Sequence, residues 1–368
     1  MCLAPLDTVL WMLFRTAPRI PPGYWPRLAL LLLISTILTV TSLPERLILA
    51  AWLRLRPPRI EKHSAPVFVL GYFRSGTTFL QSLLAADPML RSPRWAEALA
   101  PQTFVIGWII LRYVMVPFLP LARLDAVVPV GGNLPAEDDF ALNNWGLVSI
   151  LAGRAILPRQ QGFYNRFHDL DALTPVERDR WRAYQRAFVQ KQILIAGGRR
   201  LVLKSPSHTA RVRYLLDLFP GAKFIHISRP PELVFQSNLL LVRELQRAFA
   251  LQRPLPDEEQ EEIVASEYLA TERHYLVDKT LIPEGDLAEV RLEDLSADPV
   301  GEMKRLYREL GLPFSAVYEV RLRAVAAAFG KRTPNKHPEL SEAQRARVAR
   351  LAPLASAFGY ETVPRGRG

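Results

Sequence analysis

The sequence predicts an α/β protein with three layers, a central parallel sheet covered by helices on both faces, preceded by an apolar helical segment at the N-terminus. Residues 66–84, PVFVLGYFRSGTTFLQSLL, have the pattern of a buried strand, a polar turn and a helix. Residues 201–238 continue with strand, turn, helix, strand and helix. Strands that alternate with helices in this way indicate a parallel sheet.

The turn after the first strand has the spacing of a phosphate-binding loop. Gly71 and Gly76 lie five residues apart, but Thr77 stands where the nucleotide P-loop has its lysine, and the cation Arg74 lies inside the loop. Glycines let the backbone approach an anion, and the following helix N-terminus adds partial positive charge. The pattern predicts a P-loop-like anion site for a ligand other than a nucleoside triphosphate. An ordinary glycine-rich turn is the alternative.

Two later strands also end in basic residues. Lys204 follows one apolar strand and Arg229 follows the next. Ligands of open parallel sheets bind outside the carboxyl ends of the strands. Arg74, Lys204 and Arg229 could therefore face one ligand with several negative groups. Ser237 lies eight residues after Arg229, about two helical turns on, and can point toward the same edge.

These motifs together resemble the sulfotransferases that use 3′-phosphoadenosine 5′-phosphosulfate (PAPS). They are RSGTT at 74–78, KSP at 204–206, and FPGAKFIHISR at 219–229 followed by Ser237. The likeness is to bacterial Golgi-type enzymes and, more faintly, to protein-tyrosine sulfotransferases, and it covers roughly residues 66–310. The resemblance implies PAPS as donor and a hydroxyl acceptor. It also implies a phosphosulfate site at Arg74, Ser75, Gly76, Thr77 and Thr78, and a 3′-phosphate site at Arg229 and Ser237.

The resemblance also suggests catalytic roles. Arg74 and Lys204 would stabilise the charge of the transferring sulfuryl group, so no metal is required. Glu97, 23 residues after Arg74, is the candidate general base, because an acceptor hydroxyl must lose its proton as it attacks sulfur. His208 is the rival base, and a solvated helix glutamate is the structural alternative for Glu97.

Two further segments carry charge near these motifs. The basic loop at 331–337 could close over the 3′ side of the nucleotide through Lys331, Arg332 or Lys336, or could be a solvated turn. The acids at 137–139 are predicted to open a helix, where the helix dipole favours them, rather than to act in catalysis.

Composition narrows the class of partner. The 368 residues carry 47 basic and 36 acidic side chains, a net charge of +11, which suits an anionic nucleotide or anionic lipid headgroups. No nucleic-acid-binding motif accompanies that charge, so nucleic acid is not an expected partner. Cys2 is the single cysteine, which excludes an internal disulfide and fits a reducing compartment.

The first 60 residues are predicted to be a separate apolar segment that could associate with a membrane. A sulfotransferase domain at 61–368 is predicted to follow it. Residues 28–43 carry no charge, but they are fewer than the roughly 20 apolar residues that a spanning helix needs. Arginines flank the run on both sides, and no small-residue cleavage site follows. Three interpretations stay open: a membrane-surface anchor or re-entrant hairpin on the cytoplasmic side, a helical layer packed on the domain, and a single span.

Two other functions remain open at this point. A P-loop kinase or NTPase would need the missing loop lysine and an acid after the strand that ends at Ser228. A non-catalytic nucleotide-binding protein at a membrane would bind the product adenosine 3′,5′-bisphosphate (PAP) and tolerate Glu97→Ala. The sequence does not identify the acceptor. The mostly apolar residues 104–119 would suit a hydrophobic acceptor or simply pack in the core, and core packing is the safer interpretation.

Overall fold

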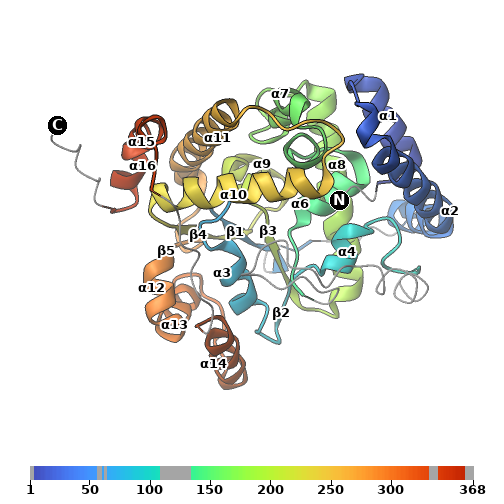
Figure 1. Cartoon of the computed structure of the whole chain (residues 1–368). Helices are drawn as coiled ribbons and strands as arrows, with labels where there is room; N and C mark the ends of the chain where they lie inside the picture. The colour runs from blue at the N-terminus through green and yellow to red at the C-terminus, as the bar shows by residue number, and fades with distance from the viewer. Residues whose placement is uncertain (1–3, 56–59, 62–63, 108–133, 331–338, 361–368) are drawn as a thin grey trace.

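A computed structural model describes residues 4–55, 60–61, 64–107, 134–330 and 339–360. It contains a five-stranded sheet of order β2-β3-β1-β4-β5, and every neighbouring pair is parallel (Figure 1). The strands are β1 (Val67–Leu70), β2 (Leu90–Arg91), β3 (Arg200–Lys204), β4 (Lys223–Ser228) and β5 (Leu287–Arg291). The predicted α/β class with a central parallel sheet is confirmed.

Helices cover both faces of the sheet, because both faces are apolar. Phe68, Leu70 and Phe224 belong to one buried cluster, which includes residues of α9 (Val212–Leu218) and α11 (Asp257–Asp278). Val67 and Val69, whose side chains point the other way, join a second cluster with α3 (Thr77–Leu84) and α13 (Pro299–Glu309). The predicted three layers follow from this alternation.

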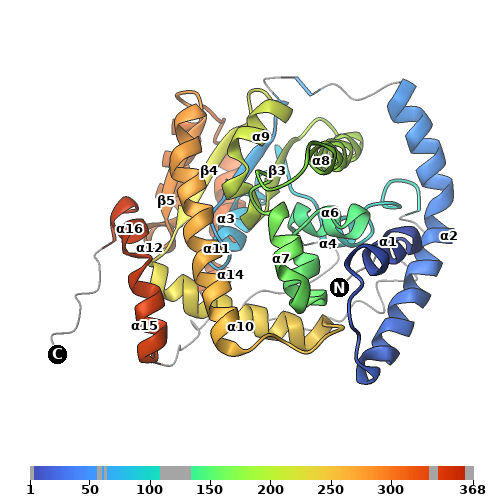
Figure 2. The same cartoon turned by 90° about the horizontal axis from the view of Figure 1, so that it is seen from above.

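The remaining helices surround this core (Figures 1 and 2). They are α1 (Leu6–Thr16), α2 (Trp25–Leu55), α4 (Trp95–Leu99), α6 (Asp138–Gly146), α7 (Gln161–Tyr164), α8 (Pro175–Ala196), α10 (Pro231–Phe249), α12 (Leu292–Ala297), α14 (Ala316–Gly330), α15 (Glu342–Ala349) and α16 (Ala352–Ala357). A π-helical turn, η3 (Ala152–Ile156), precedes α7. Thr174 caps α8 and Gly197 ends it, as the sequence Thr-Pro-Val-Glu and the following glycines predict.

The apolar N-terminal segment forms one long helix at the outer edge of the molecule. In both views α2 runs along the periphery, and α1 packs against it (Figures 1 and 2). Its inner face includes Ser35, Ser42 and Glu45, all buried. The Glu45 carboxylate accepts a hydrogen bond from Lys191 Nζ of α8 at 2.8 Å. Polar contacts of the inner face therefore help to hold α2 on the body.

Candidate active site

The loop between β1 and α3 has the backbone of a tight anion cradle. Gly71 and Gly76 have φ of 135° and 104°, which favour glycine. A Cβ on Gly71 would lie 2.5 Å from the carbonyl oxygen of Ile227 in the adjacent strand β4. Ser75 Oγ is buried without a hydrogen-bond partner among the described residues. A buried hydroxyl of this kind, beside a helix N-terminus, fits an anion that would occupy the loop.

The loop is anchored to the layer behind it. The Gly71 N–H donates to Thr209 Oγ1 at 2.7 Å, and the Tyr72 N–H donates to Glu272 of α11 at 3.1 Å. The Tyr72 ring stacks on Tyr268, with ring centroids 4.6 Å apart. These contacts fix the first half of the loop before any ligand binds.

One group of predicted site residues lies between the loop and α10. Arg74 Nε donates to Ser237 Oγ at 2.8 Å, and Arg229 donates to the Arg74 carbonyl oxygen at 3.3 Å. Burial, and then the positive charge of Arg74, lower the pKa of Arg229. Two guanidinium groups, one in the loop after β1 and one directly after β4, suit an anion with charge on more than one oxygen.

A second group lies on the other side of the loop, at the end of β3. Lys204 Nζ is 3.3 Å from Thr78 Oγ1 and 2.5 Å from Glu137 Oε1. The Lys204 side chain is 2% exposed, and that of Glu137 is 18% exposed. The strand order β3-β1-β4 places Lys204 and Arg229 on either side of the loop.

Glu97 has other partners. It lies in the first turn of α4, where Oε2 accepts from the Arg94 N–H and from Gln192 Nε2. Its Oε1 lies 2.6 Å from Arg91 NH2, and its side chain is 9% exposed. These contacts cap the helix and satisfy a buried arginine. The catalytic role of Glu97 stays a prediction.

The rival base His208 is fully buried. Its Nε2 lies 2.8 Å from Asp138 Oδ2, and its ring meets the edge of Phe68. Burial alone would raise the pKa of Asp138, but the charge of His208 and hydrogen bonds from His208 and Gln185 lower it. This pair joins α6 to the segment after β3. The basic loop at 331–337, with Lys331, Arg332 and Lys336, lies outside the described residues.

Glu137 is the residue whose contact the sequence did not predict. The prediction that the acids at 137–139 open a helix is correct, since α6 begins at Asp138. Its N-cap residue Glu137, however, makes no side-chain cap hydrogen bond and contacts Lys204 instead. A helix-opening acid whose side chain contacts a strand-end lysine 67 positions later cannot be recognised from sequence spacing alone.

The fold is that of an α/β protein with a glycine-rich loop after its central strand, and basic side chains lie on both sides of that loop. A family model described as the sulfotransferase family matches residues 66–106 and 145–316, which contain β1, the loop, β3 and β4. The chain belongs to the sulfotransferase family, so its reaction is the transfer of a sulfuryl group.

Curated relatives agree with this assignment. The chain is 33% identical, over 297 residues, to the omega-hydroxy-beta-dihydromenaquinone-9 sulfotransferase Stf3 of Mycobacterium bovis and to that of Mycobacterium tuberculosis. Each alignment covers 80% of this chain and 75% of the relative.

Solved structures share the fold. Sulfotransferase STF9 from Mycobacterium avium superposes with a TM-score of 0.70 at 20% identity, covering 99% of this chain and 98% of that one. STF1 from Mycobacterium tuberculosis superposes with a TM-score of 0.62 at 19% identity, covering 87% of each chain.

Proposed function

We propose that this sulfotransferase uses PAPS as donor. Its acceptor would be the hydroxyl group of a hydrophobic, membrane-borne lipid alcohol. The choice of donor rests on the arrangement of two groups of side chains around the loop. Lys204 and Thr78 lie on one side, and Arg74, Arg229 and Ser237 form the other group. A molecule with a phosphosulfate at one end and a 3′-phosphate at the other matches two cationic groups separated by an anion loop.

Positioning and charge stabilisation would account for most of the rate. Lys204 would hold the negative charge that grows on the bridging oxygen as the sulfur–oxygen bond breaks. The loop N–H groups and Ser75 would bind the 5′ end of the donor, and Arg229 with Ser237 would bind the 3′-phosphate. The side chains of the described residues can supply this positive charge by themselves.

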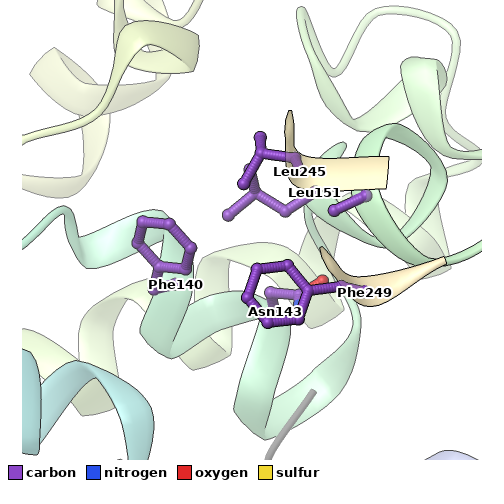
Figure 3. A pocket seen from close by; sticks show the side chains of 6 residues that line it. Phe140, Asn143, Leu151, Leu245 and Phe249 are labelled. Carbon is purple, nitrogen blue, oxygen red and sulfur yellow. The ribbon is translucent and has the colours of Figure 1, made fainter. Parts of the chain in front are cut away.

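A small apolar pocket supports a hydrophobic acceptor. It is lined by Phe140, Asn143, Leu151, Ala155, Leu245 and Phe249, whose side chains surround one space between α6, η3 and α10 (Figure 3). Phe140 lies three residues after Glu137, on the helix whose N-terminus reaches Lys204. The relative Stf3 is named for a hydroxylated menaquinone derivative. The pocket is too small to enclose a prenyl chain, but its apolar lining offers an apolar acceptor a surface on the helix that follows Glu137.

The outer face of α2 supports a membrane-borne acceptor. The stretch Pro22–Leu49 is long and apolar enough to cross a membrane, but its buried inner face includes an ion pair to the body. Its exposed apolar side chains recur every three or four residues, as on one face of a helix: Leu30, Leu33, Ile37, Val40, Leu43 and Leu47. We infer that α2 lies along the lipid surface and does not span it.

Two contacts connect α2 to the pocket. Arg27 NH1 donates to the carbonyl oxygen of Ala250 at 3.1 Å, and NH2 donates to that of Arg247 at 3.3 Å. These carbonyls belong to the end of α10, next to the pocket residue Phe249. The N-terminal part of α2 is therefore held beside the end of α10 that contributes Phe249 to the pocket.

The test is transfer of label from [³⁵S]PAPS to farnesol, a prenyl alcohol, in liposomes that contain anionic lipid. We expect a labelled lipid product with the wild-type protein and almost none with Lys204→Ala. A Leu33→Glu/Ile37→Glu variant should float less with liposomes and still bind PAP. No labelled product from the wild-type protein would contradict the proposed reaction, and unchanged flotation of the variant would contradict the proposed surface.

A further inference from the structure

We propose that Glu137, and not Glu97, is the general base that takes the proton of the acceptor hydroxyl. The inference rests on the proposed function and assigns a residue that the sequence placed in a structural role. Three observations support it: how Glu137 is held, what it contacts, and how the nearby carboxylates are occupied.

The backbone fixes Glu137 at the mouth of the donor site. The segment before α6 is bonded to the segment before α4, since the Trp95 N–H donates to Leu134 O and the Ala136 N–H donates to Pro93 O. Gln81 of α3 donates to the Ala136 carbonyl oxygen at 2.9 Å. Neighbours from two other elements thus position the residue before Glu137, which limits where its carboxylate can lie.

The carboxylate itself reaches the catalytic lysine. Glu137 Oε1 is 2.5 Å from Lys204 Nζ, and that nitrogen is 3.3 Å from Thr78 Oγ1 at the start of α3. In the proposed function Lys204 holds the bridging oxygen of the donor, so Glu137 would lie next to the reacting sulfur. Part of its side chain remains exposed, so an acceptor can approach it.

Other nearby carboxylates are occupied elsewhere. Both oxygens of Glu97 are bonded, to Arg91, Gln192 and the Arg94 N–H. Asp138 is 0% exposed and pairs with His208. Asp139 is buried against Arg211 and Ser149. Of the carboxylates that pair with Lys, Arg or His in the described chain, Glu137 is the one that contacts Lys204.

The chemistry balances with this assignment. The acceptor oxygen forms a bond to sulfur, and its proton moves to Glu137. The bond between sulfur and the bridging oxygen breaks, and PAP leaves with that oxygen and its negative charge beside Lys204. The proton then passes from Glu137 to water when the products leave. Donor binding and proton transfer are linked in this scheme. When the donor binds, Lys204 pairs with it in place of the Glu137 carboxylate, which can then accept the proton of the acceptor hydroxyl.

The experiment compares Glu137→Gln with the matched variant Glu97→Gln in two measurements. The first is PAP affinity by calorimetry. Glu137→Gln should bind PAP as tightly as the wild-type protein or several-fold more tightly, because the anion no longer competes with a carboxylate for Lys204. A residue that only supported the fold would weaken binding when changed.

The second measurement is turnover with [³⁵S]PAPS and two probes, farnesol and 4-nitrophenol at pH 8, where the phenol is already ionised. Glu137→Gln should lower kcat with farnesol by about 10²–10⁴-fold and lower it much less with 4-nitrophenol. Glu97→Gln should lose farnesol and nitrophenol turnover to the same small extent.

The outcomes separate this inference from the proposed function. Wild-type transfer to farnesol together with full activity of Glu137→Gln, or an equal loss with both probes, would overturn the role of Glu137 alone. If Glu97→Gln, and not Glu137→Gln, loses turnover with farnesol but keeps it with 4-nitrophenol, the base is Glu97. If the wild-type protein neither binds PAP nor sulfates farnesol, the proposed function fails, and this inference fails with it.

Discussion

Replacing Glu45 by alanine should strongly destabilise the protein, because this carboxylate joins α2 to the body. Its oxygens accept from Lys191 Nζ at 2.8 Å and from the backbone N–H groups of Val105, Ile106 and Gly107 at 3.1, 2.6 and 3.0 Å. The Glu45 and Lys191 side chains are 2% and 3% exposed. The variant would leave one buried cation and three N–H groups without this acceptor.

The expected loss of unfolding free energy follows from these contacts. Breaking a buried ion pair by removing one partner costs about 3–5 kcal/mol. Lys191→Met should cost less, because Glu45 keeps its three backbone N–H donors, although Glu45 and the Pro101 carbonyl oxygen both lose the Lys191 ammonium. Burial lowers the pKa of Lys191, so removing this ammonium also removes a desolvation cost that offsets part of the loss. Urea denaturation in mild detergent, followed by tryptophan fluorescence, gives the free energy of unfolding of each variant. A loss below about 1 kcal/mol for Glu45→Ala, or a larger loss for Lys191→Met, would refute the reasoning that this contact holds α2.

Two other changes test the interior. Gly71→Ala should cost about 3 kcal/mol or more of unfolding free energy, because the new Cβ would lie 2.5 Å from the Ile227 carbonyl oxygen at a φ of 135°. Burial and then Arg211 lower the pKa of His168 to about 3, against about 6.5 in the unfolded chain. The folded state therefore binds fewer protons, and stability should fall as the pH drops below 6.5, by about 2 kcal/mol at pH 5. His168→Gln should remove that part of the pH dependence.

Each of these predictions has its own control. Gly197→Ala is the comparison for Gly71→Ala, because its left-handed backbone has nothing within 4 Å of a new Cβ. Equal losses in the two glycine variants would mean that the clash with β4 is unimportant. If the wild-type protein and His168→Gln have parallel stability curves between pH 7 and 5, the buried neutral histidine does not contribute to acid sensitivity.

That the loop, Lys204 and Arg229 belong to one edge of the sheet could be predicted from sequence, because each follows a recognisable strand. The loop from Gly71 to Gly76 and its neighbouring strand and helix are contiguous, and Lys204 and Arg229 directly follow apolar strands. In a parallel sheet all these ends meet at one edge. The order of the strands, with β3 and β4 on either side of β1, was not predicted from the sequence and comes from the structure.

The partners of the carboxylates could not be predicted in the same way. Whether Glu97 or Glu137 faces Lys204 depends on how α4, α6 and α8 pack beyond β3, and in the structure Gln192 of α8 contacts Glu97. Strand β2 was also missed, because Leu90–Arg91 is two residues long and pairs with β3 through tertiary placement. A two-residue strand leaves no periodic pattern in a sequence.

The sequence did not predict which face of α2 packs against the body. Hydropathy alone left a span, a surface anchor and a packed layer open. The buried polar residues Ser35, Ser42 and Glu45 recur at intervals of seven and three, which places them on one helix face. That period distinguishes an inner face from an outer one, but it does not say what contacts either. The ion pair to Lys191 supplies that information.

The most direct test of the central claim is a calorimetric titration of PAP and of AMP, which differ only in the 3′-phosphate. We expect the wild-type protein to bind PAP about 10–150-fold more tightly than AMP, the effect of one charge-assisted hydrogen-bonded group worth about 1.5–3 kcal/mol. Arg229→Ala should bring the two affinities close together. Equal affinity of the wild-type protein for PAP and AMP, or binding of ATP with Mg²⁺ but not of PAP, would contradict the assignment of this site to PAPS.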